Sequence, residues 1–348
     1  MKFVHSETHR RHDPQFFIVR GQITRSTEQP ERADRLLAAA QRRGHERVEA
    51  RDFGEAILAE VHCPRYLDFL KNGYAQWRAL PGASQEITPH VHPPREESGY
   101  PVSIIGRAGF HIADTSSPMG PHTWDAALAA SHSACTAAQL VIEGAPAAYS
   151  LSRPPGHHAT RDRAGGFCFL NHTAVAAQWL RHHVARVAIL DVDVHHGNGT
   201  QDIFYERDDV LHVSLHADPA YFYPFFTGYA QETGRGIGAG CNLNLPLPIG
   251  TDDEAFLAAL RIACRRVLEF KPDVVVVALG LDTYEGDPLN AFRITTPGFA
   301  RIGQAIAGMA LPTVLVQEGG YLSDELGENL ATFLDGFCQH HRPTATLR

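Results

Sequence analysis

The feature that most constrains this chain of 348 residues is an alternation of short, β-branched apolar runs with longer amphipathic stretches. The strand-like runs are residues 147–152, 184–194, 210–215, 273–282 and 312–317. The stretches with apolar residues at helical spacing are 126–144, 171–184, 253–270 and 299–310. Continuously apolar strands are typical of parallel sheets that are covered on both faces. The alternation therefore predicts a single-domain α/β fold over residues 1–348, with an open, mostly parallel sheet and helices on both faces.

One stretch, residues 81–123, is rich in proline, glycine and charge and does not fit this alternation. We interpret it as one long loop within the domain rather than as a linker. Loops of this length in compact domains are usually lids, binding loops or oligomer contacts. We therefore expect this loop at a site entrance or a dimer interface.

Charge and cysteine usage limit the partners of the chain. The 31 Lys and Arg residues against 39 Asp and Glu residues give a formal charge of −8, which disfavours an extended nucleic-acid surface. A small cationic ligand is easier to accommodate. The N-terminus lacks the apolar stretch of a signal peptide, and no run has the ~18 apolar residues of a membrane span. The six cysteines form no CxxC pair, so we expect a reducing, cytoplasmic location. Together with the charge and the absence of long apolar runs, this predicts a protein without nucleic-acid or membrane partners.

Open α/β sheets bind ligands at the carboxyl ends of their strands, so the residues after each strand are the candidate site. His157 and His158 follow the first run, presented by a stiff Pro154-Pro155-Gly156 segment. A histidine pair of this kind suits general acid–base catalysis. The alternative is a solvated loop pair.

Polar residues also end the second and third of these runs. With a period of two, Asp191, Asp193 and His195 share one face of their strand. Carboxylate and imidazole groups together suit a divalent metal such as Zn²⁺, although an edge strand with a wet face is the alternative. Asp282 ends the run 273–282, where a third ligand would arrive, unless it is a turn or N-cap residue.

Tyr321 follows the last run behind two glycines, and could polarise a substrate carbonyl rather than serve as a packed aromatic. Two Asp and one His leave the fourth position of a zinc ion open, as in catalytic zinc sites. Together with the histidine pair, these residues match metal-assisted hydrolysis of an amide.

Six motifs resemble the histone deacetylase superfamily, and most closely its bacterial acetylpolyamine amidohydrolases and class II deacetylases. They are residues 153–159, 165–171, 191–205, 214–219, 280–288 and 318–321. The resemblance implies the arginase/deacetylase α/β fold, in agreement with the alternation. It also implies one Zn²⁺ per chain and a structural K⁺. The zinc ligands would be Asp193, His195 and Asp282, and Ser214 and Leu215 match the potassium pattern.

The resemblance further assigns roles around the metal. It implies that His158 is the principal general base and acid, that His157 is its electrostatic partner, and that Tyr321 stabilises the oxyanion. Asp191 would support His157 and Asn198 would support His158. A neutral Asn stabilises an imidazolium less than a carboxylate does, so we expect a lower pKa for His158.

The substrate tunnel is the part of the site that the motifs define least. By resemblance, Phe167 and Tyr223 wall the tunnel, and the 81–123 loop narrows its entrance by forming a homodimer. In this chain residues 104–107 of that loop are apolar and basic. Three nearby acids remain as candidates for binding a cationic substrate: Glu96, Glu97 and Asp114.

These observations leave three hypotheses. The first is a zinc amidohydrolase that removes acetyl groups from acetylpolyamines or similar small acylated amines. The second is a lysine deacetylase that acts on acetylated proteins or peptides. The third, from a different class, is a catalytically silent, metal-bound binding module.

Overall fold

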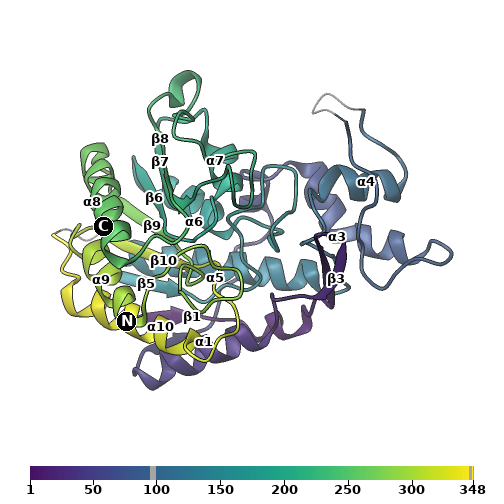
Figure 1. The fold of residues 1–348 in the computed structure, drawn as a ribbon. Coiled ribbons are helices and arrows are strands. Elements are labelled where there is room, and N and C mark those ends of the chain that lie inside the picture. The colour runs from purple at the N-terminus through teal and green to yellow at the C-terminus, as the bar shows by residue number, and fades with distance from the viewer. Residues whose placement is uncertain (95–98, 345–346, 348) are drawn as a thin grey trace.

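The computed structural model describes residues 1–94, 99–344 and 347. Its main sheet has eight parallel strands in the order β4-β1-β5-β10-β9-β6-β7-β8 (Figure 1). These strands are β1 (Lys2–Val4), β4 (Glu46–Val48), β5 (Ala147–Ser150), β6 (Val187–Asp191), β7 (Val210–Ala217), β8 (Asn242–Leu247), β9 (Val274–Leu279) and β10 (Thr313–Gln317). The predicted α/β fold with an open parallel sheet is confirmed.

Helices cover both faces of this sheet. Successive valines of β9 alternate between two cores: Val275 and Val277 face one, while Val274 and Val276 face the other, as the period of two along a strand requires. The first core is closed by α1 (Glu31–Arg42), α8 (Asp253–Phe270), α9 (Thr296–Ala307) and α10 (Leu326–His340). The second is closed by α2 (Ala56–Ala59), α3 (Pro64–Arg78), α4 (Ile104–His111), α5 (Thr123–Ile142), α6 (His172–Arg181) and α7 (Asn198–Phe204).

The local sequence explains where the best-predicted helix begins and ends. α8 spans the predicted range 253–270, because the Asp252 side chain accepts a hydrogen bond from Ala255 N at 3.0 Å and caps the first turn. Lys271 then takes a left-handed conformation with a φ of 55° and ends the helix. None of the described helices is long and apolar enough to span a membrane.

The interpretation of 81–123 as one uninterrupted loop is wrong, because the segment contains α4. The Ser103 side chain accepts a hydrogen bond from Ile105 N, and Ile104 and Ala108, four residues apart, are buried. This apolar pair gives α4 a face that packs on α3. The segment around α4 projects to the right of the sheet in Figure 1. Its role at a site entrance or dimer interface stays a prediction.

Two short elements near the N-terminus lie outside the main layers. An antiparallel hairpin joins β2 (Phe16–Val19) and β3 (Gln22–Arg25), and a 3-10 turn, η1 (Glu7–Arg11), follows β1. A second short 3-10 turn, η2 (Gly236–Gly238), precedes β8.

Candidate active site

The first part of the site is the turn that follows β6. β6 ends at Asp191, so the prediction that Asp191, Asp193 and His195 share one face of a strand is wrong. The carboxylates themselves turn the chain: Asp193 N donates to Asp191 Oδ1 at 3.1 Å, and His195 N donates to Asp193 Oδ1 at 2.9 Å. Short acidic side chains that accept local backbone N–H groups commonly replace ladder hydrogen bonds in this way.

The turn still brings the three predicted metal ligands together. One possible ligand atom from each of Asp193, His195 and Asp282 lies within 4.8 Å of the others, and all three residues are buried. His195 Nδ1 is 3.1 Å from Asp193 Oδ1 and 3.2 Å from Asp282 Oδ2. We call these three residues the interior cluster.

The chemistry of the interior cluster fits a divalent cation. Asp282 Oδ2 is buried and makes no hydrogen bond among the described residues. Burial, followed by the neighbouring Asp193 carboxylate, raises the pKa of Asp282 to about 6. A Cβ on Gly319 would overlap the Asp282 carboxylate, so only glycine leaves this space free. Two crowded carboxylates and one imidazole form a ligand set that suits Zn²⁺.

The histidine pair lies beside this cluster, and its two rings have different partners. His157 Nδ1 is 2.9 Å from Asp191 Oδ2, and His158 Nδ1 is 2.7 Å from Asn198 Oδ1. The two ring centroids are 4.1 Å apart. The structure therefore contains both predicted contacts, between His157 and Asp191 and between His158 and Asn198.

The two imidazoles differ in their affinity for a proton. Burial lowers the pKa of His157, but the charges of Asp193 and Asp191 outweigh it and raise the pKa to about 10. Burial, with the neighbouring His157 and His195, holds the pKa of His158 well below its ordinary value. These opposite pKa shifts favour a charged imidazolium at His157 and a neutral imidazole at His158, and such a separation of pKa values is typical of acid–base sites.

Two acids that the sequence reasoning gave no catalytic part fix the surrounding backbone. Glu318, the residue after β10, accepts hydrogen bonds from Gly156 N at 2.6 Å and from His157 N at 2.9 Å. Asp287, interpreted from sequence as a turn residue, accepts from Tyr321 N at 2.7 Å. Glu318, like Asp282, follows an apolar strand, and that position was the signal available in the sequence.

Tyr321 and Phe167 form one wall of the site, with their ring centroids 5.6 Å apart. The sequence reasoning missed a third aromatic, Phe17 of the β2–β3 hairpin, which meets Phe167 edge to face at 5.6 Å. Arg32 lies 4.6 Å from the centre of the Tyr321 ring, and its Nη2 donates to Glu318 O at 2.7 Å. Arg32 thereby holds the segment that carries Tyr321.

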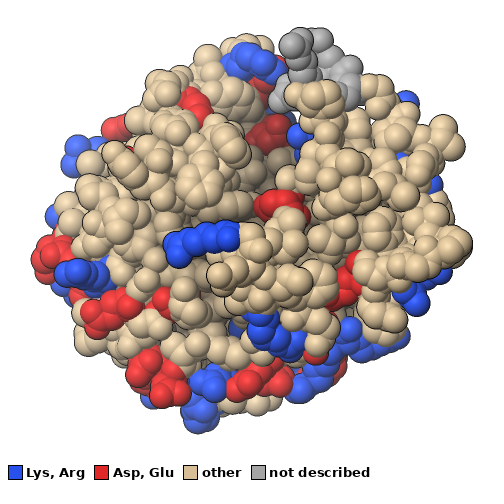
Figure 2. All heavy atoms as spheres, turned by 45° about the vertical axis from the view of Figure 1, so that its right-hand side comes forward, with Lys and Arg blue, Asp and Glu red and all other residues tan. Residues whose placement is uncertain are grey.

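Tyr223 forms the other wall, edge-on to His158 with 5.0 Å between the ring centroids. Its hydroxyl donates to Asp114 Oδ2 at 2.7 Å, and Gly166 N donates to the same oxygen at 3.2 Å. Figure 2 shows a hollow in the face turned toward the viewer, with acidic residues inside it. Of the three candidate acids, Asp114 therefore lies beside Tyr223, while Glu96 and Glu97 lie outside the described residues. The Arg107 guanidinium pairs with Gln76 and Asp68, away from this wall.

The residues expected to hold potassium lie beside Asp191, two residues before the first member of the interior cluster. Ser214 of β7 is in register with Asp191 of β6, and Leu215 follows it. Ser214 Oγ is 2.8 Å from His216 Nδ1. The presence of the ion stays a prediction.

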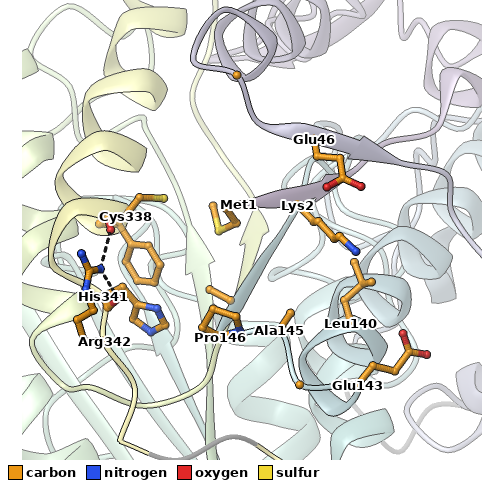
Figure 3. A pocket seen from close by; sticks show the side chains of 14 residues that line it. Met1, Lys2, Glu46, Leu140, Glu143, Ala145, Pro146, Cys338, His341 and Arg342 are labelled. Carbon is orange, nitrogen blue, oxygen red and sulfur yellow. Dashed lines mark hydrogen bonds between the residues drawn. The ribbon is translucent and has the colours of Figure 1, made fainter.

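A groove of about 770 Å³ lies at the opposite, amino-terminal edge of the sheet (Figure 3). Met1, Lys2 and Pro146 line it, with Arg342 hydrogen-bonded to the carbonyl groups of Cys338 and His341. The groove therefore holds none of the predicted site residues.

The fold and the site together define the class of this protein: a parallel α/β enzyme with a buried Asp-His-Asp cluster, a histidine pair and a nearby tyrosine. The histone deacetylase domain model matches residues 26–337, and the chain belongs to that family. It is thus a deacetylase or amidohydrolase enzyme rather than a silent binding module.

Similar proteins share nearly their full length with this chain. An acetylpolyamine amidohydrolase from Burkholderia pseudomallei is 47% identical over 94% of this chain and 95% of its own. An acetylpolyamine amidohydrolase from Mycoplana ramosa is 42% identical over 97% of this chain and 99% of its own. The crystal structure of an acetylpolyamine aminohydrolase from B. pseudomallei superposes with a TM-score of 0.92, at 46% identity, over 97% of this chain and 98% of that one.

Proposed function

We propose that this enzyme is a zinc-dependent amidohydrolase that removes acetyl groups from acetylpolyamines or similar small acylated amines. The observation that carries the proposal is the position of His158, which is hydrogen-bonded to Asn198, beside the interior cluster Asp193, His195 and Asp282. The names of the similar bacterial enzymes support the polyamine class.

Asp193, His195 and Asp282 would hold the zinc ion. When bound there, the ion supplies a Lewis acid that polarises a carbonyl and lowers the pKa of a bound water. Backbone N–H groups hold both carboxylates in place, since Gly319 N donates to Asp193 Oδ2 at 2.8 Å and Val194 N donates to Asp282 Oδ1 at 3.1 Å. A ligand set with its geometry fixed in advance binds a metal without reorganisation.

The proton is moved by His158. Because Asn198 Oδ1 can accept a hydrogen bond but cannot donate one, His158 carries its proton on Nδ1 and presents the lone pair of Nε2. His158 then takes a proton from the attacking water at Nε2 and returns it to the leaving amine. His157, charged beside Asp191, stabilises the negative charge that develops on the substrate carbonyl oxygen.

Tyr321 completes the reaction centre as a hydrogen-bond donor. Burial, with the carboxylates of Asp282 and Asp193 against it, raises the pKa of Tyr321 well above its ordinary value, while Arg32 opposes the rise. The phenol therefore keeps its proton at neutral pH and can donate it in a hydrogen bond to the oxyanion.

A carboxylate at the tunnel wall supports a cationic substrate. Asp114 is in contact with Tyr223 and Gly166, and no Lys, Arg or His of the described residues forms an ion pair with it. Such a charge, next to aromatic walls, favours an amine that carries a further ammonium group beyond the acetamide.

Purified enzyme should be assayed on acetylputrescine, acetylspermidine and an acetyl-lysine peptide, with and without a chelator. We expect the two polyamines to turn over fastest and the chelator to stop all three reactions. Peptide turnover far above polyamine turnover would favour the lysine deacetylase hypothesis. Absence of turnover on every substrate after zinc loading would reject the proposed function.

We further propose a homodimer in which the 81–123 segment meets its partner, one K⁺ beside Ser214 and Leu215, a cytoplasmic location, and no nucleic-acid or membrane partner. Light scattering on a size-exclusion column tests the first of these, because a dimer has twice the mass of a 38.2 kDa chain.

A further inference from the structure

A second group of possible metal ligands lies where β1 runs into η1, and we call it the N-terminal cluster. Its members are His5, Glu7 and His9, and one ligand atom from each lies within 4.8 Å of the others. His5 Nε2 is 3.9 Å from Glu7 Oε1, and the two imidazole centroids are 4.8 Å apart. His5 is completely buried and His9 is 2% exposed, whereas Glu7 reaches the surface.

The imidazole nitrogens of this cluster lack partners. His9 Nδ1, His9 Nε2 and His5 Nε2 make no hydrogen bond among the residues that the structure describes. Buried polar groups of folded proteins are nearly always paired, so an unpaired group calls for an ion or a water. His5 Nε2, one His9 ring nitrogen and one Glu7 oxygen lie close enough together to share a single partner.

The orientation of His5 selects a cation as that partner. His5 Nδ1 is 3.3 Å from the carbonyl oxygen of Leu151, so it carries the proton and donates it. The lone pair of Nε2 is then directed at Glu7. Metal-binding histidines almost always donate their second ring N–H to a carbonyl or carboxylate in this way, which fixes the tautomer.

Two arginines hold the carboxylate of this cluster in place. Glu7 Oε2 accepts a hydrogen bond from Arg10 Nε at 2.8 Å, and Glu7 Oε1 accepts one from Arg47 Nη1 at 2.9 Å. Each arginine also forms an ion pair with a second acid. Arg10 Nη2 is 2.6 Å from Asp34 Oδ1, and Arg47 Nη2 is 3.3 Å from Glu49 Oε1. Their positive charge is thus shared rather than directed wholly at the cluster.

We propose that His5, Glu7 and His9 form a second divalent-metal site that binds Zn²⁺ or a similar borderline cation. Two neutral imidazoles and one carboxylate are a common zinc ligand set. Because the Glu7 side chain is exposed, a cation can reach the cluster from solvent. The site is linked to the catalytic loop, because Arg153 Nη1 donates to His9 O at 2.7 Å and the chain runs from Arg153 to His157. Metal there would fasten β1 and η1 to that loop and would stabilise the fold without entering the reaction.

The metal content of the full-length enzyme tests this inference independently of its substrate. Protein stripped of metal is equilibrated with buffered Zn²⁺, and bound zinc is counted by mass spectrometry across a range of free zinc. We expect wild type to reach two zinc ions per chain. Glu7→Gln and His9→Asn should each reach one at the same free zinc, and Asp282→Asn, which changes the interior cluster, should also reach one.

Controls keep the result interpretable. His183→Ala removes an exposed histidine outside both clusters and should keep two ions. Glu7→Gln changes an exposed side chain, so circular dichroism should show an intact fold, and zinc should raise its unfolding temperature less than that of wild type. One zinc per chain in wild type throughout the titration would mean that the cluster holds only a water. A second zinc that persists in both Glu7→Gln and His9→Asn would also overturn the assignment.

Discussion

The interior cluster and the N-terminal cluster contain the same kinds of side chain, but their charges are balanced differently. In the interior cluster two carboxylates crowd one imidazole, and Asp282 has a free buried oxygen. In the N-terminal cluster a single carboxylate is already held by two arginines, and the free atoms are imidazole nitrogens. In the interior cluster, a cation relieves the repulsion between two buried carboxylates. In the N-terminal cluster, it provides a partner for unpaired imidazole nitrogens. We therefore expect tight, catalytic metal binding in the interior and weaker, structural binding near the N-terminus.

The largest expected effect separates the two clusters by activity. Asp282→Asn removes a charged ligand from the interior cluster and leaves the N-terminal cluster unchanged. Loss of metal-based stabilisation worth several kcal/mol should lower kcat/KM by about 10³-fold or more. Steady-state assays on acetylputrescine measure this, with Glu7→Gln as the matched acid-to-amide control. Equal losses in the two variants would remove the distinction between a catalytic and a structural site.

A second variant separates metal binding from catalysis within the interior. Tyr321→Phe removes only the hydroxyl, so zinc content should equal that of wild type. Turnover should fall by about 10²-fold or more, as on loss of an oxyanion donor. Zinc analysis and kcat measured on one preparation give both numbers. Unchanged turnover would refute the role assigned to Tyr321.

A third variant tests whether the negative charge of Asp114, outside the interior cluster, contributes to binding of a cationic substrate. Asp114→Asn keeps an acceptor for the Tyr223 hydroxyl but removes the charge. We expect KM for acetylputrescine to rise by about tenfold, a typical cost of one partly exposed ionic contact. KM for N-butylacetamide, which is neutral and of similar length, should stay the same. A parallel rise for both substrates would assign Asp114 a purely structural part.

The smallest effect concerns the histidine that supports the catalytic loop. His172 Nε2 is 3.0 Å from the carbonyl oxygen of Pro154, and burial lowers the pKa of His172 to about 3. The unfolded chain binds a proton at this residue below pH ~6.5 and the folded chain does not, so stability is complete above that pH and declines as the pH falls toward 3. From pH 7 to 6 this one group should cost about 0.7 kcal/mol of unfolding free energy.

Urea unfolding of wild type and His172→Gln at these two pH values measures that cost. The glutamine variant should lose less stability between pH 7 and 6, because its unfolded state takes up one proton fewer. The same loss in both proteins would mean that folding does not lower the pKa of His172. Other buried histidines with lowered pKa, such as His12 and His62, should keep some pH dependence in the variant.

The contrast between the clusters also explains how far the sequence alone could lead. Asp193, His195 and Asp282 were predictable because each follows a strongly apolar run, where a charged residue is unexpected and where parallel strands place their ligands. His5 and His9 follow a strand of three residues, too short to show a pattern. The sequence around them is polar and has the character of a surface turn.

Long-range contacts account for the other residues that sequence reasoning missed. Phe17 reaches Phe167 only because it lies in a hairpin outside the main sheet, far from Phe167 in the sequence. α4 was hidden in a segment whose prolines and charges indicate a loop. The turn after β6 departs from the expected strand because its carboxylates capture backbone N–H groups, a competition that periodicity alone does not show.

The central claim is that one zinc ion in the interior cluster makes this enzyme an amidohydrolase. The most direct measurement is the turnover of acetylputrescine by metal-stripped Glu7→Gln enzyme as Zn²⁺ is added back, with bound zinc counted at each point. We predict no turnover without zinc, a rise in proportion to bound zinc, and saturation at one ion per chain. Full turnover in the metal-stripped enzyme, or no turnover once one zinc is bound, would contradict the claim.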